Sequence, residues 1–215
     1  MQLDSTTFIV FGALVVAVIL HEISHGVVAL WFGDDTARQA GRLTLNPIPH
    51  IDPFGSIIVP AIGALTGIPV IGWAKPVPVN PSRLRNPKRD YLWVSLAGPA
   101  TNLLLMTGAA VAAHFMFRSY TDASLLTLSE FPVAFRFMFW FAVVNMSLAI
   151  FNLLPIPPLD GSAILELFMP DSWRENWYRY RQYGILVLYV LFFAFGLGRR
   201  VIDPMISRLA EFVTS

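Results

Sequence analysis

Two histidines and one glutamate stand close together in a stretch of the chain that is otherwise apolar. His21, Glu22 and His25 follow the apolar residues 8–20 and are followed by the apolar residues 27–32. Because residues four positions apart lie on one face of a helix, His21 and His25 can hold a single metal ion. Glu22 lies one position round the helix, where a general base that activates water beside a metal belongs.

The apolar setting of these three side chains adds to their significance. Ionisable groups at membrane depth are costly to bury, so they mark a functional site by default. The alternative is a set of polar helix residues that form hydrogen bonds to neighbouring helices. The spacing and the setting together predict a metal site within a membrane-spanning helix.

The composition is that of an integral membrane protein. The chain has 215 residues, of which 55% are hydrophobic and 13% are charged, and its mean hydropathy is +0.60. Soluble domains contain about 25% charged residues. The chain has no cysteine, so any zinc ion must be held by histidine and carboxylate side chains. The lipid bilayer is therefore an expected partner. The net charge of +1 gives no sign of a nucleic-acid partner.

Several segments are apolar enough to enter a bilayer, whose crossing needs about 20 residues. Four of them predict membrane spans, the last being short: about 6–32, 91–117, 131–154 and 183–197. A fifth, 54–70, contains two prolines and three glycines. These helix-breaking residues favour a segment that dips into the membrane, with a complete fifth span as the alternative.

The charged loops predict the orientation of these spans. Residues 72–90 carry five basic residues and one acidic residue, which places this loop in the cytoplasm by the positive-inside rule. Residues 119–130 carry two acidic residues and no basic one, so they are expected outside. The first span then has its His and Glu residues towards the cytoplasmic end. Arg199 and Arg200 would lie outside, against this rule.

A catalytic zinc site has three protein ligands and one open position, so a third ligand is needed. The candidates are His50, His114 and a carboxylate. Asp160 is the strongest, because it lies near the end of the stretch 152–161, where three prolines interrupt a helix. A helix broken in this way can direct a carboxylate towards a metal. An interfacial turn in which Asp160 caps the helix 162–168 is an equally good interpretation of these residues.

Three motifs, in this order along the chain, together resemble one protein family. They are 21–26 (HEISHG), 97–102 (AGPATN) and 152–161 (NLLPIPPLDG). They resemble the site-2 protease family of intramembrane zinc metalloproteases. The stretch 72–80 (GWAKPVPVN) is similar to that of compact bacterial and archaeal members without an inserted PDZ domain. The resemblance extends over roughly residues 10–168.

The resemblance implies roles for individual residues. It implies three core helices in which His21, His25 and Asp160 bind one Zn²⁺ ion and Glu22 activates the water. It also implies that Asn152 contacts the substrate or stabilises the developing oxyanion, which requires a fixed hydrogen-bond donor such as an amide.

A short strand is also expected. Residues 41–46 alternate between polar and apolar and end before Pro47, which predicts a strand and a turn. This segment resembles the family's membrane-edge strand. Leu43, Thr44 and Leu45 are therefore expected to pair with an unwound substrate segment by strand addition.

The small residues of the second motif have a structural interpretation. Ala97, Gly98 and Pro99 lie within a predicted span, where small side chains let helices approach each other closely. Asn102 is expected to form a hydrogen bond between helices.

The expected fold is an all-α polytopic membrane protein. It has a three-helix core and a C-terminal transmembrane helix, together with the membrane-edge β element and the re-entrant segment. Residues 1–215 are expected to form one protease domain, with its core at about 6–169 and the C-terminal span and tail at about 180–215.

The function expected from these features is regulated intramembrane proteolysis. A multi-pass zinc metalloprotease in the cell membrane would hydrolyse a peptide bond within or near a transmembrane segment of its substrate. A membrane metal-binding or transport protein is an alternative, but 8–20 and 133–150 offer no ionisable pathway except Arg136. An inactive scaffold member is a second alternative, and binding a metal alone would not require Glu22.

Overall fold

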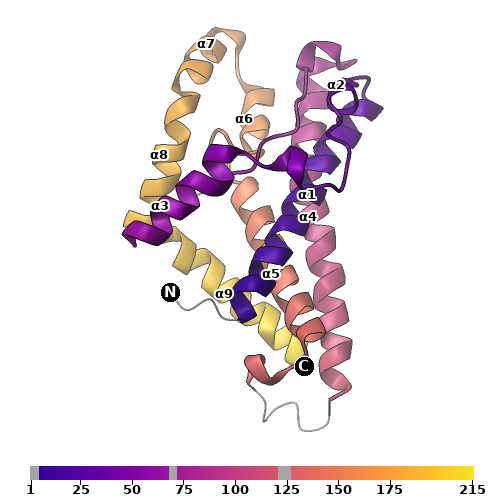
Figure 1. The fold of residues 1–215 in the computed structure, drawn as a ribbon. Coiled ribbons are helices and arrows are strands. Elements are labelled where there is room, and N and C mark those ends of the chain that lie inside the picture. Colours follow the sequence, from indigo (N-terminus) through magenta and orange to yellow (C-terminus); the bar gives the residue numbers. More distant parts are fainter. Residues whose placement is uncertain (1–4, 68–71, 121–126) are drawn as a thin grey trace.

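Helices account for all of the regular secondary structure among the residues that the structure describes. The computed structural model describes residues 5–67, 72–120 and 127–215, and no strand occurs among them (Figure 1). Three helices are long and apolar enough to cross a membrane, namely α1 (Ser5–Trp31), α4 (Pro87–Arg118) and α5 (Val133–Asn152). They confirm the first three predicted spans, and the chain is an all-α multi-pass membrane protein.

Each of α1, α4 and α5 contacts the other two (Figure 1). Ala17 on α1, Ala113 on α4 and Ala142 on α5 are fully buried in their common core. Such small side chains let membrane helices approach closely. Phe135 and Phe139 of α5 are buried in the same core and fill the wider spaces.

The C-terminal part of the chain forms two helical stretches joined at a sharp bend. The first contains α7 (Asp171–Tyr180), η6 (Arg181–Tyr183), α8 (Gly184–Tyr189) and η7 (Val190–Ala194), and the second is α9 (Leu197–Thr214). The axes of Glu175–Ala194 and Leu197–Thr214 differ by 66°. The bend therefore lies at the end of the predicted fourth span, 183–197, and joins it to α9. Gly196 lies at the bend with a φ of 63°, a left-handed conformation that ends the first stretch.

α9 packs against α4 and α5 through one face. Leu209 and Val213 are buried in the common core, whereas Arg199 and Arg200 at the start of the helix are exposed. On α4, Nδ1 of His114 lies 3.0 Å from the backbone oxygen of Phe212. His114 thus takes part in holding the end of α9.

The other helices among the described residues are short. They are α2 (Thr36–Gln39), η1 (Ile48–His50), η2 (Pro53–Ile58), α3 (Val59–Thr66), η3 (Pro81–Arg83), η5 (Leu128–Glu130) and α6 (Ser162–Phe168).

The apolar segment η2–α3 leaves the helix bundle, and the chain then returns to where the segment began. The backbone N–H of Trp73 donates to the carbonyl of Gly55 at 3.1 Å, and the Ser56 hydroxyl donates to the carbonyl of Trp73 at 2.9 Å. The first turn of η2 therefore lies beside Trp73, which follows the segment, whereas a complete span would separate these residues. This arrangement agrees with a re-entrant segment and not with a complete fifth span.

The prediction of a strand at 41–46 is wrong. These residues form turns, because local side chains take up the backbone groups that a strand would need. The Thr44 hydroxyl accepts from the backbone N–H of Asn46 at 3.2 Å, and the Asn46 side chain accepts from the N–H of Ile48 at 3.1 Å. Nε2 of His50 lies 3.0 Å from the backbone oxygen of Thr44. Leu43, Thr44 and Leu45 therefore do not form the free strand edge that the prediction required.

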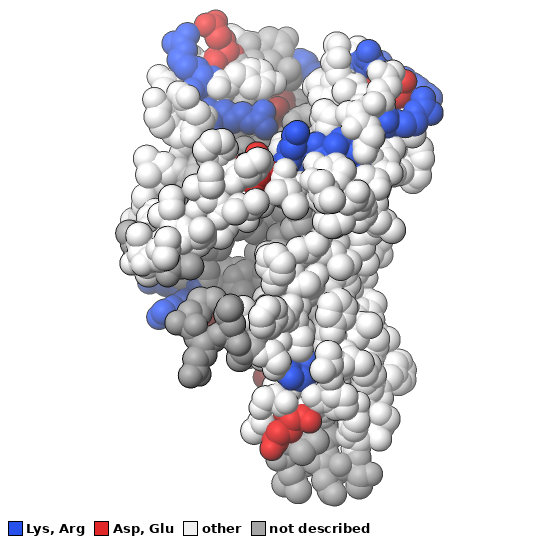
Figure 2. Space-filling model, in the orientation of Figure 1, with Lys and Arg blue, Asp and Glu red and all other residues white. Residues whose placement is uncertain are grey.

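Lysine and arginine side chains gather at one end of the molecule. In the space-filling view they concentrate at the end that carries α2 and α7, and the wide middle is almost uncharged (Figure 2). This distribution suits a protein whose middle lies in lipid.

Candidate metal centre and active site

Helix α1 places two imidazole rings against each other. His21 and His25 are one turn apart, and their Nε2 atoms are separated by 3.0 Å. Both side chains are buried, with 7% and 8% of their surface exposed. The rings meet edge to face, with centroids 4.6 Å apart. The two rings therefore lie on one face of α1, as the spacing of His21 and His25 predicted.

Asp160 joins the two histidines from a distant part of the chain. Its Oδ2 lies 3.2 Å from Nε2 of His21 and 3.5 Å from Nε2 of His25. The same oxygen is buried and has no hydrogen-bond partner. Among the described residues, these three side chains form a group that could hold a metal ion. His50 and His114 lie outside this group.

The loop that carries Asp160 is closed by its own backbone. The N–H of Gly161 donates to the carbonyl of Asn152 at 2.6 Å, which joins the two ends of the motif 152–161. A Cβ atom at Gly161 would collide with the backbone of Leu153, so only glycine fits there. Gly184 of α8 lies against the Pro157 carbonyl from the other side. Both glycines thus allow the close contacts that position Asp160.

Helix α4 supports the imidazole rings at Gly98. A Cβ atom added there would lie 2.5 Å from Nε2 of His25 and would also collide with His21. Gly98 was expected to let two helices pack closely, and in the structure it makes room for the two imidazole rings.

Each ring forms a second hydrogen bond through Nδ1. Nδ1 of His25 lies 2.7 Å from the backbone oxygen of Val94, and Nδ1 of His21 lies 2.6 Å from Oδ1 of Asn102. Neither oxygen carries a hydrogen, so each Nδ1 must donate in a neutral ring. Each Nε2 then presents a lone pair.

This donor set fits a zinc ion. With both rings neutral, two lone pairs and a carboxylate oxygen face one another, an arrangement that a cation would stabilise. Nitrogen and oxygen ligands of a tetrahedral zinc ion lie about 3.3 Å from one another. The three separations of 3.0, 3.2 and 3.5 Å are close to this value.

Glu22 lies beside this group and is held by a different segment. Its Oε2 accepts a hydrogen bond of 2.7 Å from the backbone N–H of Val77. Residues 72–80, here called the strap, run without regular secondary structure across this part of the molecule. The N–H of Lys75 donates to the carbonyl of His50 at 3.0 Å, and Arg42 donates to the carbonyl of Lys75 at 2.6 Å.

Gly26 explains how the strap approaches α1 so closely. A Cβ atom there would lie 2.5 Å from Cδ2 of Leu43 and 3.1 Å from Cγ1 of Val77. Leu43, which was expected to pair with substrate, therefore packs against the helix beside His25.

Asn152 occupies the last position of α5 and shares its loop with Asp160. Its backbone carbonyl closes that loop. No hydrogen bond of its side chain to another described residue is found, so its amide is available for another partner.

Sequence reasoning missed three groups around the site, namely the Val94 carbonyl, the Val77 N–H and the Asn145 side chain. The first two are backbone groups, whose partners cannot be read from side-chain types. Asn145 could have been found, because a fully buried amide in an apolar span is unusual.

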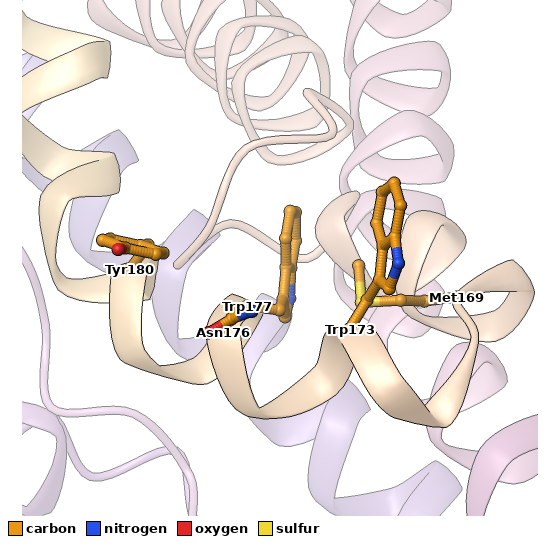
Figure 3. A pocket seen from close by; sticks show the side chains of 5 residues that line it. All are labelled: Met169, Trp173, Asn176, Trp177 and Tyr180. Carbon is orange, nitrogen blue, oxygen red and sulfur yellow. The ribbon is translucent and has the colours of Figure 1, made fainter.

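The aromatic pocket near α7 is separate from this chemistry. It is lined by Met169, Trp173, Asn176, Trp177 and Tyr180 (Figure 3). The Trp177 indole donates to Glu166 at 2.9 Å. The pocket contains no member of the His-His-Asp group.

Comparison with known proteins shows the family of this chain. The sequence profile of Peptidase family M50 matches residues 129–196. A Bacillus subtilis protein named "Putative zinc metalloprotease YwhC" is 39% identical over 196 residues, covering 90% of this chain and 84% of that protein. The chain belongs to peptidase family M50, the site-2 protease family.

More distant relatives occur in mycobacteria. "Putative zinc metalloprotease Rip2" of Mycolicibacterium smegmatis is 30% identical over 197 residues, covering 89% of this chain and 69% of that protein. "Putative zinc metalloprotease Rip3" of Mycobacterium tuberculosis is 26% identical over 163 residues, covering 76% of this chain and 30% of that protein. No solved structure matches the chain.

Proposed function

We propose that this M50 protein is a zinc endopeptidase that cleaves membrane proteins within or near a transmembrane segment. One observation carries the proposal. His21, His25 and Asp160 converge within 3.5 Å, beside Glu22 and in contact with membrane-spanning helices. The names of the relatives support zinc as the metal and proteolysis as the reaction.

The chain's own residues supply most of the chemistry. Zn²⁺ held by His21, His25 and Asp160 would act as a Lewis acid that polarises the scissile carbonyl and acidifies water. Glu22 accepts a proton from the attacking water and passes it to the nitrogen of the leaving amine. The water oxygen ends on the carbonyl carbon, and the C–N bond breaks.

Asn152 is the proposed donor to the oxyanion. A tetrahedral intermediate places negative charge on the former carbonyl oxygen, and a fixed amide N–H stabilises that charge. Asn152 stands at the other end of the closed loop from Asp160, and its amide is not used by another described residue.

The position of the site along α1 supports the proposed substrate class. His21 lies ten positions before the end of α1 at Trp31, which corresponds to about 15 Å along a helix. A soluble peptide would have to enter the bilayer to reach it, whereas a transmembrane segment is already there. The substrate must unwind locally, since a helix has no free backbone to present. This is the setting of regulated intramembrane proteolysis.

The active site is proposed to face the cytoplasm. The loop 72–90 carries five basic residues against one acidic residue, which predicts a cytoplasmic position. Val77 belongs to this loop and donates directly to Glu22. The catalytic end of α1 therefore lies on the same side as the basic loop. Residues 1–215 are treated as one protease domain.

A reconstituted assay tests the proposal. Purified protein and a model single-span substrate with helix-breaking residues are placed in lipid vesicles, and cleavage is followed by mass spectrometry. Glu22→Gln should lower the rate by about 100- to 10,000-fold, the contribution of a general base, while zinc content stays equal to wild type. Glu175→Gln, the same change at an exposed position on α7, should cleave normally.

Two outcomes would refute the proposal. Cleavage by the Glu22→Gln protein at the wild-type rate would remove the assigned base. Full zinc affinity in an Asp160→Ala protein would remove the third ligand.

A further inference from the structure

A chain of hydrogen bonds leads from the metal group through α4 to α5. Nδ1 of His21 lies 2.6 Å from Oδ1 of Asn102, and the Asn102 amide donates to Oδ1 of Asn145 at 2.8 Å. The Asn145 amide in turn donates to the backbone carbonyl of Phe141 at 2.8 Å. Three spans are therefore joined by one line of polar groups.

The direction of every bond in this chain is fixed by its last member. The Phe141 carbonyl can only accept, so Asn145 must turn its NH₂ group towards it. Oδ1 of Asn145 then faces Asn102, whose NH₂ group must point at it. Oδ1 of Asn102 is left facing His21, and the ring must carry its hydrogen on Nδ1.

Both histidines thus carry their hydrogen on Nδ1, but they donate it to different acceptors. His25 donates directly to a backbone carbonyl, that of Val94, at 2.7 Å. His21 donates instead to Asn102, and the chain of two amides ends on a backbone carbonyl. In both rings Nε2 is left with a free lone pair on the side of Asp160.

Burial fixes the orientation of both amides in this chain of hydrogen bonds. Asn102 and Asn145 are both fully buried, in helices that cross the membrane. A buried amide that lost its partner could not turn to water, so neither side chain can reverse without leaving polar atoms unpaired. A simple helix–helix contact would need only the bond between the two amides and would not have to end on a metal-binding ring.

We infer that Asn145, acting through Asn102, holds His21 in the Nδ1–H state and orients its Nε2 towards the metal. Both asparagines are positioning residues for the metal site. The inference rests on the proposed function, since it takes His21 as a zinc ligand. It extends that function to a residue on α5 that touches neither metal nor substrate.

Metal affinity is the appropriate measurement, because it needs no substrate. The full chain is purified in detergent, and zinc affinity is measured by competition with a chelator. Partners of this kind change metal affinity by about 10- to 100-fold. Asn102→Leu, which removes the acceptor, should weaken binding by that factor and alter the visible spectrum of the cobalt-substituted protein. Asn102→Asp keeps an acceptor for His21 and should bind zinc at least ten times more tightly than Asn102→Leu.

Asn145 is tested alone and in combination. Asn145→Leu should weaken zinc binding by about 10-fold, and it should have no further effect in the Asn102→Leu protein. Ser147→Ala is the matched control on α5, since Ser147 donates only to the Val143 carbonyl of its own helix. Its zinc affinity and cobalt spectrum should equal those of wild type.

Each contrary result has a definite meaning. A folded Asn102→Leu protein with wild-type affinity overturns the inference, as does an Asn145→Leu effect that persists in full without Asn102. If Asn102→Leu does not fold, wild-type affinity in Asn145→Leu decides against the inference. A wild-type protein that binds no zinc refutes the proposed function as well, whereas normal zinc binding in wild type and in every variant refutes only this inference.

Discussion

The backbone N–H of Val77 donates a 2.7 Å hydrogen bond to Oε2 of Glu22. The strap thereby fixes one oxygen of the proposed general base and leaves Oε1 to exchange protons with water. Val77 stands between two prolines, Pro76 and Pro78, so its own N–H is the one donor that these three residues offer. The motif around it is thus suited to a single directed hydrogen bond.

Replacing Val77 with proline should therefore disable the base without touching the metal. A hydrogen bond to a charged group contributes about 1.5–3 kcal/mol, so kcat should fall by about 10- to 100-fold. Zinc content should not change. Val77→Thr keeps the N–H and nearly the same shape, and it serves as the control. Equal kcat values for the two variants in the vesicle assay would show that the bond has no catalytic role.

Gly98 should tolerate no side chain. A Cβ atom there would lie 2.5 Å from Nε2 of His25, and the ring would have to move away from its partners. Gly98→Ala should lower zinc affinity by at least about 10-fold. Gly108 on the same helix has nothing within 4 Å of an added Cβ atom, so Gly108→Ala should keep normal affinity. Chelator competition measures both, and equal affinities would contradict the packing of the rings on α4.

Some features could be predicted from the types and spacing of the side chains. The spacing of His21 and His25 predicted their shared face. The three prolines before Asp160 predicted a broken helix that could direct its carboxylate, although a simple capping turn suited the same residues equally well. The first three spans followed from apolar length alone.

Features that depend on backbone contacts could not be predicted in this way. Every residue except proline carries the same N–H and C=O groups, so nothing in the sequence shows that the Val77 N–H meets Glu22 or that the Val94 carbonyl meets His25. The alternation at 41–46 suggested a strand, but the side chains of Thr44 and Asn46 bind the local backbone and form turns instead. The bend at Gly196 depends on a left-handed conformation that a glycine permits but does not require.

Helix α8 should be needed to hold the metal-binding loop. Gly184 lies against the Pro157 carbonyl, so Gly184→Ala must push α8 and the loop apart. Overpacking of this kind costs about 1–3 kcal/mol, and both the melting temperature and zinc affinity should fall. Gly12 on α1 has free space around an added Cβ atom, and Gly12→Ala should preserve both. A Gly184→Ala protein that melts and binds zinc like wild type would show that α8 does not support the loop.

Removal of zinc should destabilise the whole protein and not only stop catalysis. Without a cation, the Nε2 lone pairs and the Asp160 carboxylate face one another uncompensated in a buried site. Zinc at 100 times its dissociation constant stabilises the folded state by about 2.7 kcal/mol. For a chain of this size the melting temperature should then fall by about 5–10 °C when a chelator is added. The Asp160→Ala protein, which lacks one ligand, should melt at the same temperature with and without the chelator. A wild-type melting temperature that does not respond to the chelator would mean that the three side chains hold no structurally important metal.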